Sequence, residues 1–212
     1  MTLALWTSLV TILGVWLVTV VSPGPNFLAT AYTATAQSRR LGLLVCLGIA
    51  VGTTIWATAS LLGLGLLFRS TAWLYQVVKL AGGLYLIYLG ARLLISAGWR
   101  GRGPAVAVAP RLPALSPARA FRRGLIVDLG NPKAAVFFTS LFAVTVPPDA
   151  PLWFQALIVV AVVAMAGGWY ALVACLVSLR PVAAAFERAK RAVACVTGAA
   201  FVALGARLAA DR

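Results

Sequence analysis

Long apolar stretches are the feature that most limits what this chain can fold into. Of its 212 residues, 62% are hydrophobic and only 10% are charged, whereas a soluble globular chain carries roughly 25% charged residues. The stretches are long enough for membrane-spanning helices, which need about 18 or more consecutive residues of low polarity. We therefore predict an all-α, multi-pass membrane protein with six transmembrane helices, surrounded by the lipid bilayer.

Prolines interrupt two of the predicted spans. The first is broken at residues 22–26, which read Ser-Pro-Gly-Pro-Asn, and the fourth at residues 130–132, which read Gly-Asn-Pro. Because proline removes one backbone hydrogen bond and clashes with the preceding turn, both helices should break there. The six spans are expected at about residues 6–33, 41–67, 73–95, 124–146, 152–176 and 192–209.

The charge of the chain is strongly positive, with 18 Lys and Arg against 4 Asp and Glu. The basic residues lie mainly in short segments between apolar stretches, where the cytoplasmic loops of membrane proteins collect them. We therefore predict no nucleic-acid partner. Arginines after the first, third and fifth spans place those loops in the cytoplasm and both termini outside. Residues 98–123, rich in Pro, Ala and Arg, are expected to form a flexible or partly extended cytoplasmic linker within one membrane domain, residues 1–212.

The chain contains no histidine, and its three cysteines are isolated within apolar stretches. This excludes histidine metal sites and Ser-His catalytic triads, and it argues against a metal or electron carrier. We predict no metal, no cofactor and no enzymatic activity. Two alternatives remain beside a transporter: a membrane-embedded enzyme, for which few catalytic groups are available, and a scaffold subunit that transports nothing.

A repeated motif links the third and sixth spans. Gly83 precedes the string Gly-Ala-Arg-Leu at residues 90–93, and Gly198 precedes the same string at residues 205–208. Chance is the alternative explanation, since these residue types are abundant here. The proline breaks recur at a similar separation, so we predict two repeats of three spans, about residues 1–97 and 124–212. An odd number of spans per repeat requires opposite insertion, which is the inverted-repeat architecture of many secondary transporters.

The two helix breaks are the candidate solute-binding elements. A broken helix exposes backbone amides and carbonyls inside the protein, where they can hold the carboxylate and the ammonium of a zwitterion. A structural kink satisfied by neighbouring helices is the alternative. The paired breaks favour transport, and the predicted substrate-binding residues are Pro23, Gly24, Pro25, Asn26, Asn131, Pro132 and Lys133.

Ionisable side chains inside membrane helices are costly and commonly functional. Three lie within the predicted spans. Lys79 is interpreted as a residue that extends its ammonium toward the membrane surface rather than binding solute. Asp128 either pairs with Arg122 and Arg123 or serves as the proton-coupling residue. Lys133 follows the second break and has only Asp128 as an evident partner, so these two residues form the predicted charge-sensitive element.

The second span contains a Gly-x-x-x-Gly motif at Gly48 and Gly52. Such motifs allow close helix approach, and we interpret this one as a packing surface within one chain or between two copies in a homodimer. Most of the seven tryptophans fit anchoring at the membrane interface, with Trp56, in the middle of its span, as an exception.

These motifs, in this order, resemble the LysE/RhtB family of amino-acid exporters over nearly the whole chain. The resemblance implies six spans and efflux of amino acids or derivatives across the bacterial inner membrane in exchange for protons. At position 128 the resemblance implies Asn, whereas this chain has Asp. The motifs are Ser-Pro-Gly-Pro-Asn at 22–26, Arg39-Arg40, the glycines at 42, 48 and 52, Lys-Leu-Ala-Gly-Gly-Leu-Tyr-Leu at 79–86, Phe-Arg-Arg-Gly at 121–124, Asn-Pro-Lys-Ala at 131–134 and Phe137-Phe138.

Overall fold

The computed structural model describes residues 2–22, 24–70, 72–98, 115–147, 149–177, 192, 195–203 and 205–207. Within them the chain is helical, which confirms the all-α prediction. The helices are α1 (Thr2–Val21), α2 (Pro25–Ala36), α3 (Arg39–Ser70), α4 (Ala72–Gly98), α5 (Pro117–Leu129), α6 (Pro132–Thr145) and α7 (Leu152–Leu176), followed by a C-terminal helix, Cys195–Arg207.

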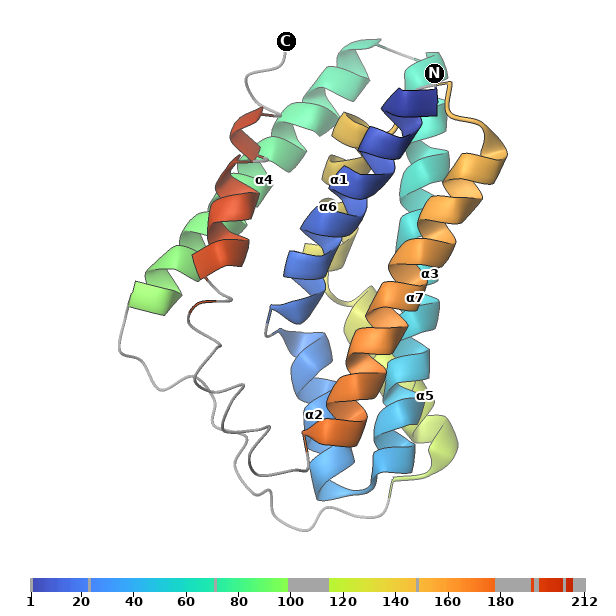
Figure 1. Ribbon diagram of the computed structural model, residues 1–212, viewed down its shortest axis with the longest axis vertical. Coiled ribbons are helices and arrows are strands. Elements are labelled where there is room, and N and C mark those ends of the chain that lie inside the picture. Colours follow the sequence, from blue (N-terminus) through green and yellow to red (C-terminus); the bar gives the residue numbers. More distant parts are fainter. Residues whose placement is uncertain are drawn as a thin grey trace.

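The helices form an elongated bundle (Figure 1). α4 and the C-terminal helix lie together at one edge, α1 and α6 occupy the centre, and α3 and α7 lie at the other edge. α2 and α5 continue the bundle toward one end, on the far side of the two breaks. α3 packs extensively against α5 and α7.

Two helices of the described chain, Arg39–Gly63 and Leu152–Leu176, are each long and apolar enough to cross a membrane. Leu5–Val21 and Pro25–Ala36, which meet at an angle of 51°, add a third if the pair is one broken span rather than a re-entrant loop. Large apolar side chains on their outer faces are exposed, such as Val10 at 70% and Val160 at 65%, as expected for a lipid-facing surface. The count of six crossings stays a prediction.

The predicted linker ends earlier than the sequence indicated. Residues 117–123 were expected to be flexible or extended, but they form the first half of α5. Two local signals explain the helix start: Ser116 caps it by accepting a hydrogen bond from the Arg119 amide, and Pro117 occupies the first turn, where its missing N–H costs nothing. Residues 99–114 lie outside the described part of the chain.

The Gly-x-x-x-Gly motif of α3 packs against α5 of the same chain. A Cβ atom at Gly48 would collide with the backbone of Phe121, and a Cβ atom at Gly124 would collide with the backbone of Val45. Glycine at both positions therefore lets the two helix backbones touch. Of the two interpretations of this motif, packing within one chain is the one that the structure shows.

A second glycine contact joins α4 to the C-terminal helix. A Cβ atom at Gly90 would lie 2.6 Å from the Gly198 carbonyl oxygen, and one at Gly205 would lie 2.5 Å from the Gly83 carbonyl oxygen. The residue numbers rise in one helix as they fall in the other, so the two helices run antiparallel. The repeated motif found in the sequence thus contacts its own second copy.

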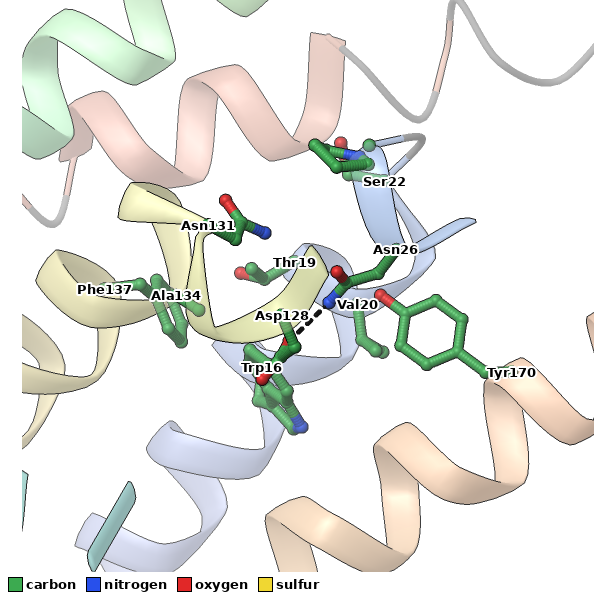
Figure 2. A pocket seen from close by; sticks show the side chains of 12 residues that line it. Trp16, Thr19, Val20, Ser22, Asn26, Asp128, Asn131, Ala134, Phe137 and Tyr170 are labelled. Carbon is green, nitrogen blue, oxygen red and sulfur yellow. Dashed lines mark hydrogen bonds between the residues drawn. The ribbon is translucent and has the colours of Figure 1, made fainter. Parts of the chain in front are cut away.

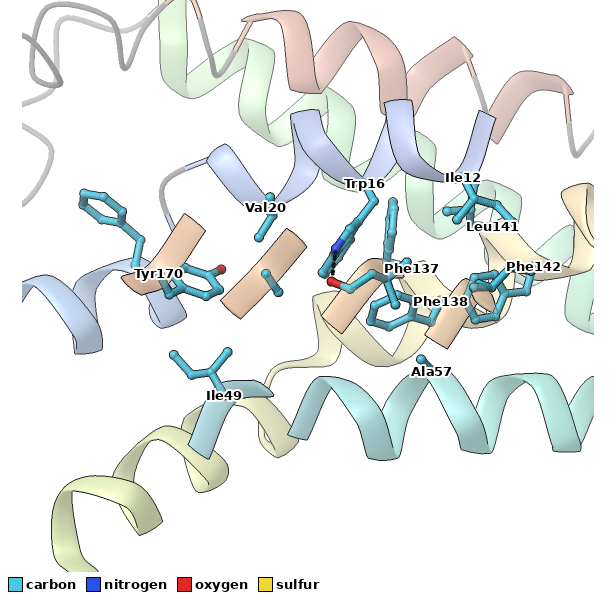
Figure 3. Packing of buried hydrophobic residues seen from close by; sticks show 14 of the residues in the cluster. Ile12, Trp16, Val20, Ile49, Ala57, Phe137, Phe138, Leu141, Phe142 and Tyr170 are labelled. Carbon is cyan, nitrogen blue, oxygen red and sulfur yellow. Dashed lines mark hydrogen bonds between the residues drawn. The ribbon is translucent and has the colours of Figure 1, made fainter. Parts of the chain in front are cut away.

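Buried aromatic rings fill the centre of the bundle on the α6 side of the breaks (Figure 3). Trp16 of α1 packs on Phe138, with ring centroids 4.7 Å apart, and on Phe137, at 5.4 Å. Phe137 also contacts Phe201 of the C-terminal helix. The Trp16 indole donates a hydrogen bond to the Val162 carbonyl oxygen at 2.9 Å, which fixes this cluster to α7.

Candidate functional site

The two helix breaks meet at one pocket. Its walls come from the end of α1, the start of α2, the end of α5, the start of α6 and one residue of α7 (Figure 2). The cavity holds about 30 Å³, which is room for a water-sized molecule. The predicted site residues that line it are Gly24, Pro25, Asn26, Asp128 and Asn131. Pro23 and the side chains of Pro132 and Lys133 lie outside the described residues.

The first break follows from its prolines. Gly24 has an extended backbone, with φ −156° and ψ −173°, as expected for a residue that precedes proline. Pro25 then occupies the first turn of α2, where no amide hydrogen is needed. The amide of Leu28 bonds the Gly24 carbonyl at 2.9 Å and so begins the regular helix.

The second break is closed by tight backbone hydrogen bonds. The Gly130 amide donates to the Ile126 carbonyl at 2.8 Å, and the Asn131 amide donates to the Asp128 carbonyl at 3.0 Å. α6 starts at the following proline. The pocket therefore faces the N-termini of two half-helices, α2 and α6, whose peptide dipoles favour negative charge.

Asp128 lies at the centre of the site, with only 1% of its surface exposed. Its Oδ1 accepts a hydrogen bond from Asn26 Nδ2 at 2.6 Å, which joins the two breaks directly (Figure 2). Its other side faces α3, where a Cβ atom at Gly52 would lie 2.6 Å from Oδ2. The Arg123 guanidinium lies instead over the Tyr32 ring, 5.4 Å from its centroid. The structure thus shows Asn26 as the partner of Asp128, rather than the arginines.

Two buried polar atoms at the pocket, Ser22 Oγ and Asn26 Oδ1, have no hydrogen-bond partner among the described residues. The Asp128 carboxylate has the Asn26 amide and the Thr53 hydroxyl as donors, which leaves acceptor capacity at Oδ2. Buried polar atoms are nearly always paired, so such a group of acceptors marks a place where a donor belongs. An ammonium group supplies three donors and a positive charge. The pocket is therefore chemically suited to a cationic amine on its Asp128 side.

Comparison with known proteins identifies the family to which this chain belongs. Residues 17–212 match the family model described as LysE type translocator. The chain belongs to the LysE type translocator family. It is 33% identical over 206 residues to the threonine efflux proteins of Salmonella typhi and Escherichia coli (strain K12), covering 95% of this chain and 97% of each relative. It is 32% identical over 147 residues to the leucine efflux protein of Salmonella choleraesuis, covering 69% of this chain and 65% of that protein. No solved structure matches the chain.

Family membership confirms two predictions from the sequence, the resemblance to LysE/RhtB exporters and the absence of an enzymatic role. A LysE type translocator is a membrane transporter, which agrees with the apolar exposed surface of its helices. The paired helix breaks are therefore part of a transport protein. This argues against the alternative of a scaffold subunit that transports nothing.

Sequence reasoning missed several residues that line this translocator's pocket, among them Tyr170 and Trp16. Tyr170 of α7 points its hydroxyl toward Asn26 (Figure 2). It lies near a span end, where the sequence gives no sign that distinguishes it from an interfacial aromatic residue. Trp16 was assigned to interface anchoring, but it is buried and lines the pocket. Its position deep within the first span was a signal that could have identified it.

Trp56, singled out as a tryptophan in the middle of a span, supports the second break. Its indole Nε1 donates a hydrogen bond to the Asp128 carbonyl oxygen at 3.2 Å. The neighbouring Thr53 is buried, with 1% of its surface exposed. α3 therefore contacts both the side chain and the backbone of the residue at the centre of the site.

Replacing Trp56 with Phe should lower transport while leaving the protein folded. The change removes the donor to Asp128, and losing one buried hydrogen bond costs about 1–3 kcal/mol. We expect a drop in the midpoint of thermal unfolding in detergent and slower solute flux in vesicles. Trp153→Phe, at a tryptophan that is 58% exposed, is the matched control. Equal behaviour of the two variants would contradict a role for Trp56 at the break.

Proposed function

We propose that this translocator exports amino acids or related small zwitterionic metabolites from the cytoplasm in exchange for protons. Its relatives named threonine efflux protein and leucine efflux protein support the solute class. The observation that carries the proposal is the pocket itself, because two helix breaks 105 residues apart, at Asn26 and Asn131, converge on one buried carboxylate.

The pocket offers complementary groups for both ends of an amino acid. Asp128 Oδ2, Asn26 Oδ1 and Ser22 Oγ are available to the ammonium group. The N-termini of α2 and α6 favour the carboxylate. We include Pro23, Pro132 and Lys133 in this site as a prediction from the sequence. A pocket of about 30 Å³ must widen to admit an amino acid.

Asp128 couples the solute to protons through competition. A charged carboxylate within a membrane helix is unfavourable by about 2.5–3.5 kcal/mol on insertion scales. Binding either a proton or the solute ammonium removes this cost. Since the Asn26 amide occupies Oδ1, the proton and the ammonium compete for Oδ2. One ligand must leave before the other binds, which is the requirement for exchange.

We further propose that the translocator consists of two inverted repeats of three membrane spans. The glycine contacts of α4 with the C-terminal helix support this arrangement, because they are reciprocal: Gly83 meets Gly205 and Gly90 meets Gly198. A two-fold axis that exchanges the two motif copies produces this pairing. In each repeat a broken helix comes first, α1 with α2 or α5 with α6, and a long helix follows.

The orientation in the bacterial inner membrane follows from the arginines. Arg39 and Arg40 start α3, and Arg119, Arg122 and Arg123 lie in α5. The Leu115 amide, just before α5, bonds Gln37 Oε1 at 3.2 Å, so both basic segments are at the same end of the bundle. We assign this end to the cytoplasm by the positive-inside rule.

A flux measurement tests the proposal. Purified protein in lipid vesicles, with amino acid inside and a proton gradient imposed across the membrane, should release threonine, leucine or another neutral amino acid faster than protein-free vesicles. Cells that overproduce the translocator should also tolerate toxic analogues of the same amino acid. If a broad amino-acid panel yields neither flux nor binding, the proposed solute class is wrong.

A further inference from the structure

One face of α2, continued by the residue that caps its C-terminus, carries polar side chains along its whole length. Asn26, Thr30, Thr33 and Gln37 are spaced by four, three and four residues, which places them in a single narrow row on a helix. The row starts at the pocket, where Asn26 bonds Asp128. It ends at Gln37, which bonds the Leu115 amide at the basic end of the bundle.

The two threonines of this row are fully buried. Thr30 and Thr33 each have 0% of their surface exposed. The Thr30 hydroxyl donates to the Asn26 carbonyl at 2.9 Å, and this leaves its lone pairs available. Thr33 Oγ1 has no hydrogen-bond partner among the described residues. Keeping an unpaired hydroxyl in the interior is unfavourable, so its presence calls for an explanation in another state of the protein.

Small residues pack α2 against α3 and α7 on the face next to this row, at Ala34. A Cβ atom at Gly42 of α3 would lie 2.7 Å from the Ala34 Cβ of α2 and 3.3 Å from the Ala174 Cβ of α7. These small side chains offer little resistance to a movement of α2 against α3 and α7. The other side of the pocket differs, because α6 contributes the large buried rings of Phe137 and Phe138 there.

We infer that the row Asn26–Thr30–Thr33 is the route by which the solute reaches the pocket from the cytoplasm. When α2 separates from α5 and Leu115, to which the two ends of the row are bonded, the threonine hydroxyls replace water for the charged ends of the solute. The aromatic cluster on the α6 side keeps the outer half closed meanwhile. This inference rests on the proposed export function for its direction, but the accessibility of the row can be measured independently of any solute.

Thiol labelling tests whether the row becomes accessible to water from the cytoplasmic side. Thr30→Cys and Thr33→Cys are made in a parent in which Cys46, Cys175 and Cys195 are replaced by Ala and which still transports. Inside-out vesicles are treated with a membrane-impermeant methanethiosulfonate. We expect both cysteines to react at least about tenfold faster than the control, and excess L-threonine or L-leucine to slow the reaction.

Ala31→Cys is the matched control. Ala31 is also 0% exposed and lies on the same helix, but it belongs to a different face of α2. Equal labelling at positions 31 and 33 would overturn the inferred route. Labelling of the row without protection by any amino acid, together with absent flux, would instead overturn the proposed solute class and leave the route standing.

A second variant separates a transport role from a structural one. Thr33→Val keeps the shape of the side chain and removes the unpaired hydroxyl, so the thermal unfolding midpoint in detergent should stay the same or rise. We expect its transport to fall about tenfold, as for loss of one hydrogen bond, and Thr33→Ser to restore it. Full transport by the valine variant would contradict the inference.

Discussion

Replacing Asp128 with Asn is expected to abolish the dependence of solute export on the proton gradient. An amide can neither take up a proton at neutral pH nor pair with an ammonium as a charge. Loss of a charge-assisted hydrogen bond costs about 1.5–3 kcal/mol, which corresponds to a roughly ten- to hundredfold loss of solute affinity. The remaining flux should therefore be slow and identical at every imposed pH gradient.

The expected pH dependence of the unmodified protein has a definite sign. At high pH on the cytoplasmic side, Asp128 is ionised and can receive the solute ammonium. At low pH on the outer side, protonation of the carboxyl group displaces the ammonium and releases the solute. Export should therefore increase when the outer side is made acidic, and this increase should disappear in Asp128→Asn.

Flux in vesicles with imposed pH gradients checks this prediction. Asp149→Asn, at an exposed acid between α6 and α7, removes the same charge away from the pocket and should retain coupling. Because Asn is nearly isosteric with Asp, the unfolding midpoint of Asp128→Asn should stay close to that of the unmodified protein. Unchanged coupling in a folded Asp128→Asn variant would remove this residue from the mechanism.

The second large effect is expected at Gly48, where α3 touches α5. A methyl group at this position meets the Phe121 carbonyl and the Leu125 amide, which are backbone atoms that cannot turn aside as a side chain can. Overpacking of this kind costs about 1–3 kcal/mol when neighbours can adjust. Here the helices must separate, so Gly48→Ala should lose at least about 3 kcal/mol of stability.

Transport should fail together with stability in this variant, because the same helix pair holds Asp128 against Gly52. The midpoint of thermal unfolding in detergent and the flux in vesicles measure the two effects. Gly63→Ala is the control on the same helix, since a Cβ atom there would have no neighbour within 4 Å. Equal stability of Gly48→Ala and Gly63→Ala would contradict the close backbone contact between α3 and α5.

The sequence predicted the helices well because hydrophobic length and proline position determine them locally. The expected fifth span, 152–176, has the same bounds as α7, and the break at Pro25 is where α2 begins. The start of α5 was missed because six arginines and several prolines in residues 98–123 suggested a linker. The cap at Ser116 was the local signal that was overlooked.

The site was predicted in part. The breaks point to Asn26, Asn131 and Asp128 because prolines and buried charges are visible in the sequence. The direct bond between Asn26 and Asp128 could not be foreseen, since it depends on how two distant helices rotate against each other. Tyr170 was hidden for the same reason, because only the packing of α7 brings it to the pocket.

The reciprocal contact of Gly83 with Gly205 and of Gly90 with Gly198 has a consequence for the ancestry of the chain. A surface that recognises a copy of itself does not need a covalent connection to do so. If the proposed inverted repeat is correct, the product of an ancestral half-length gene, inserted into the membrane in both directions, would already have made this contact between separate subunits. Duplication and fusion of that gene would then have preserved the motif, because each glycine contacts the duplicate of the other: Gly83 meets Gly205, the equivalent of Gly90, and Gly90 meets Gly198, the equivalent of Gly83.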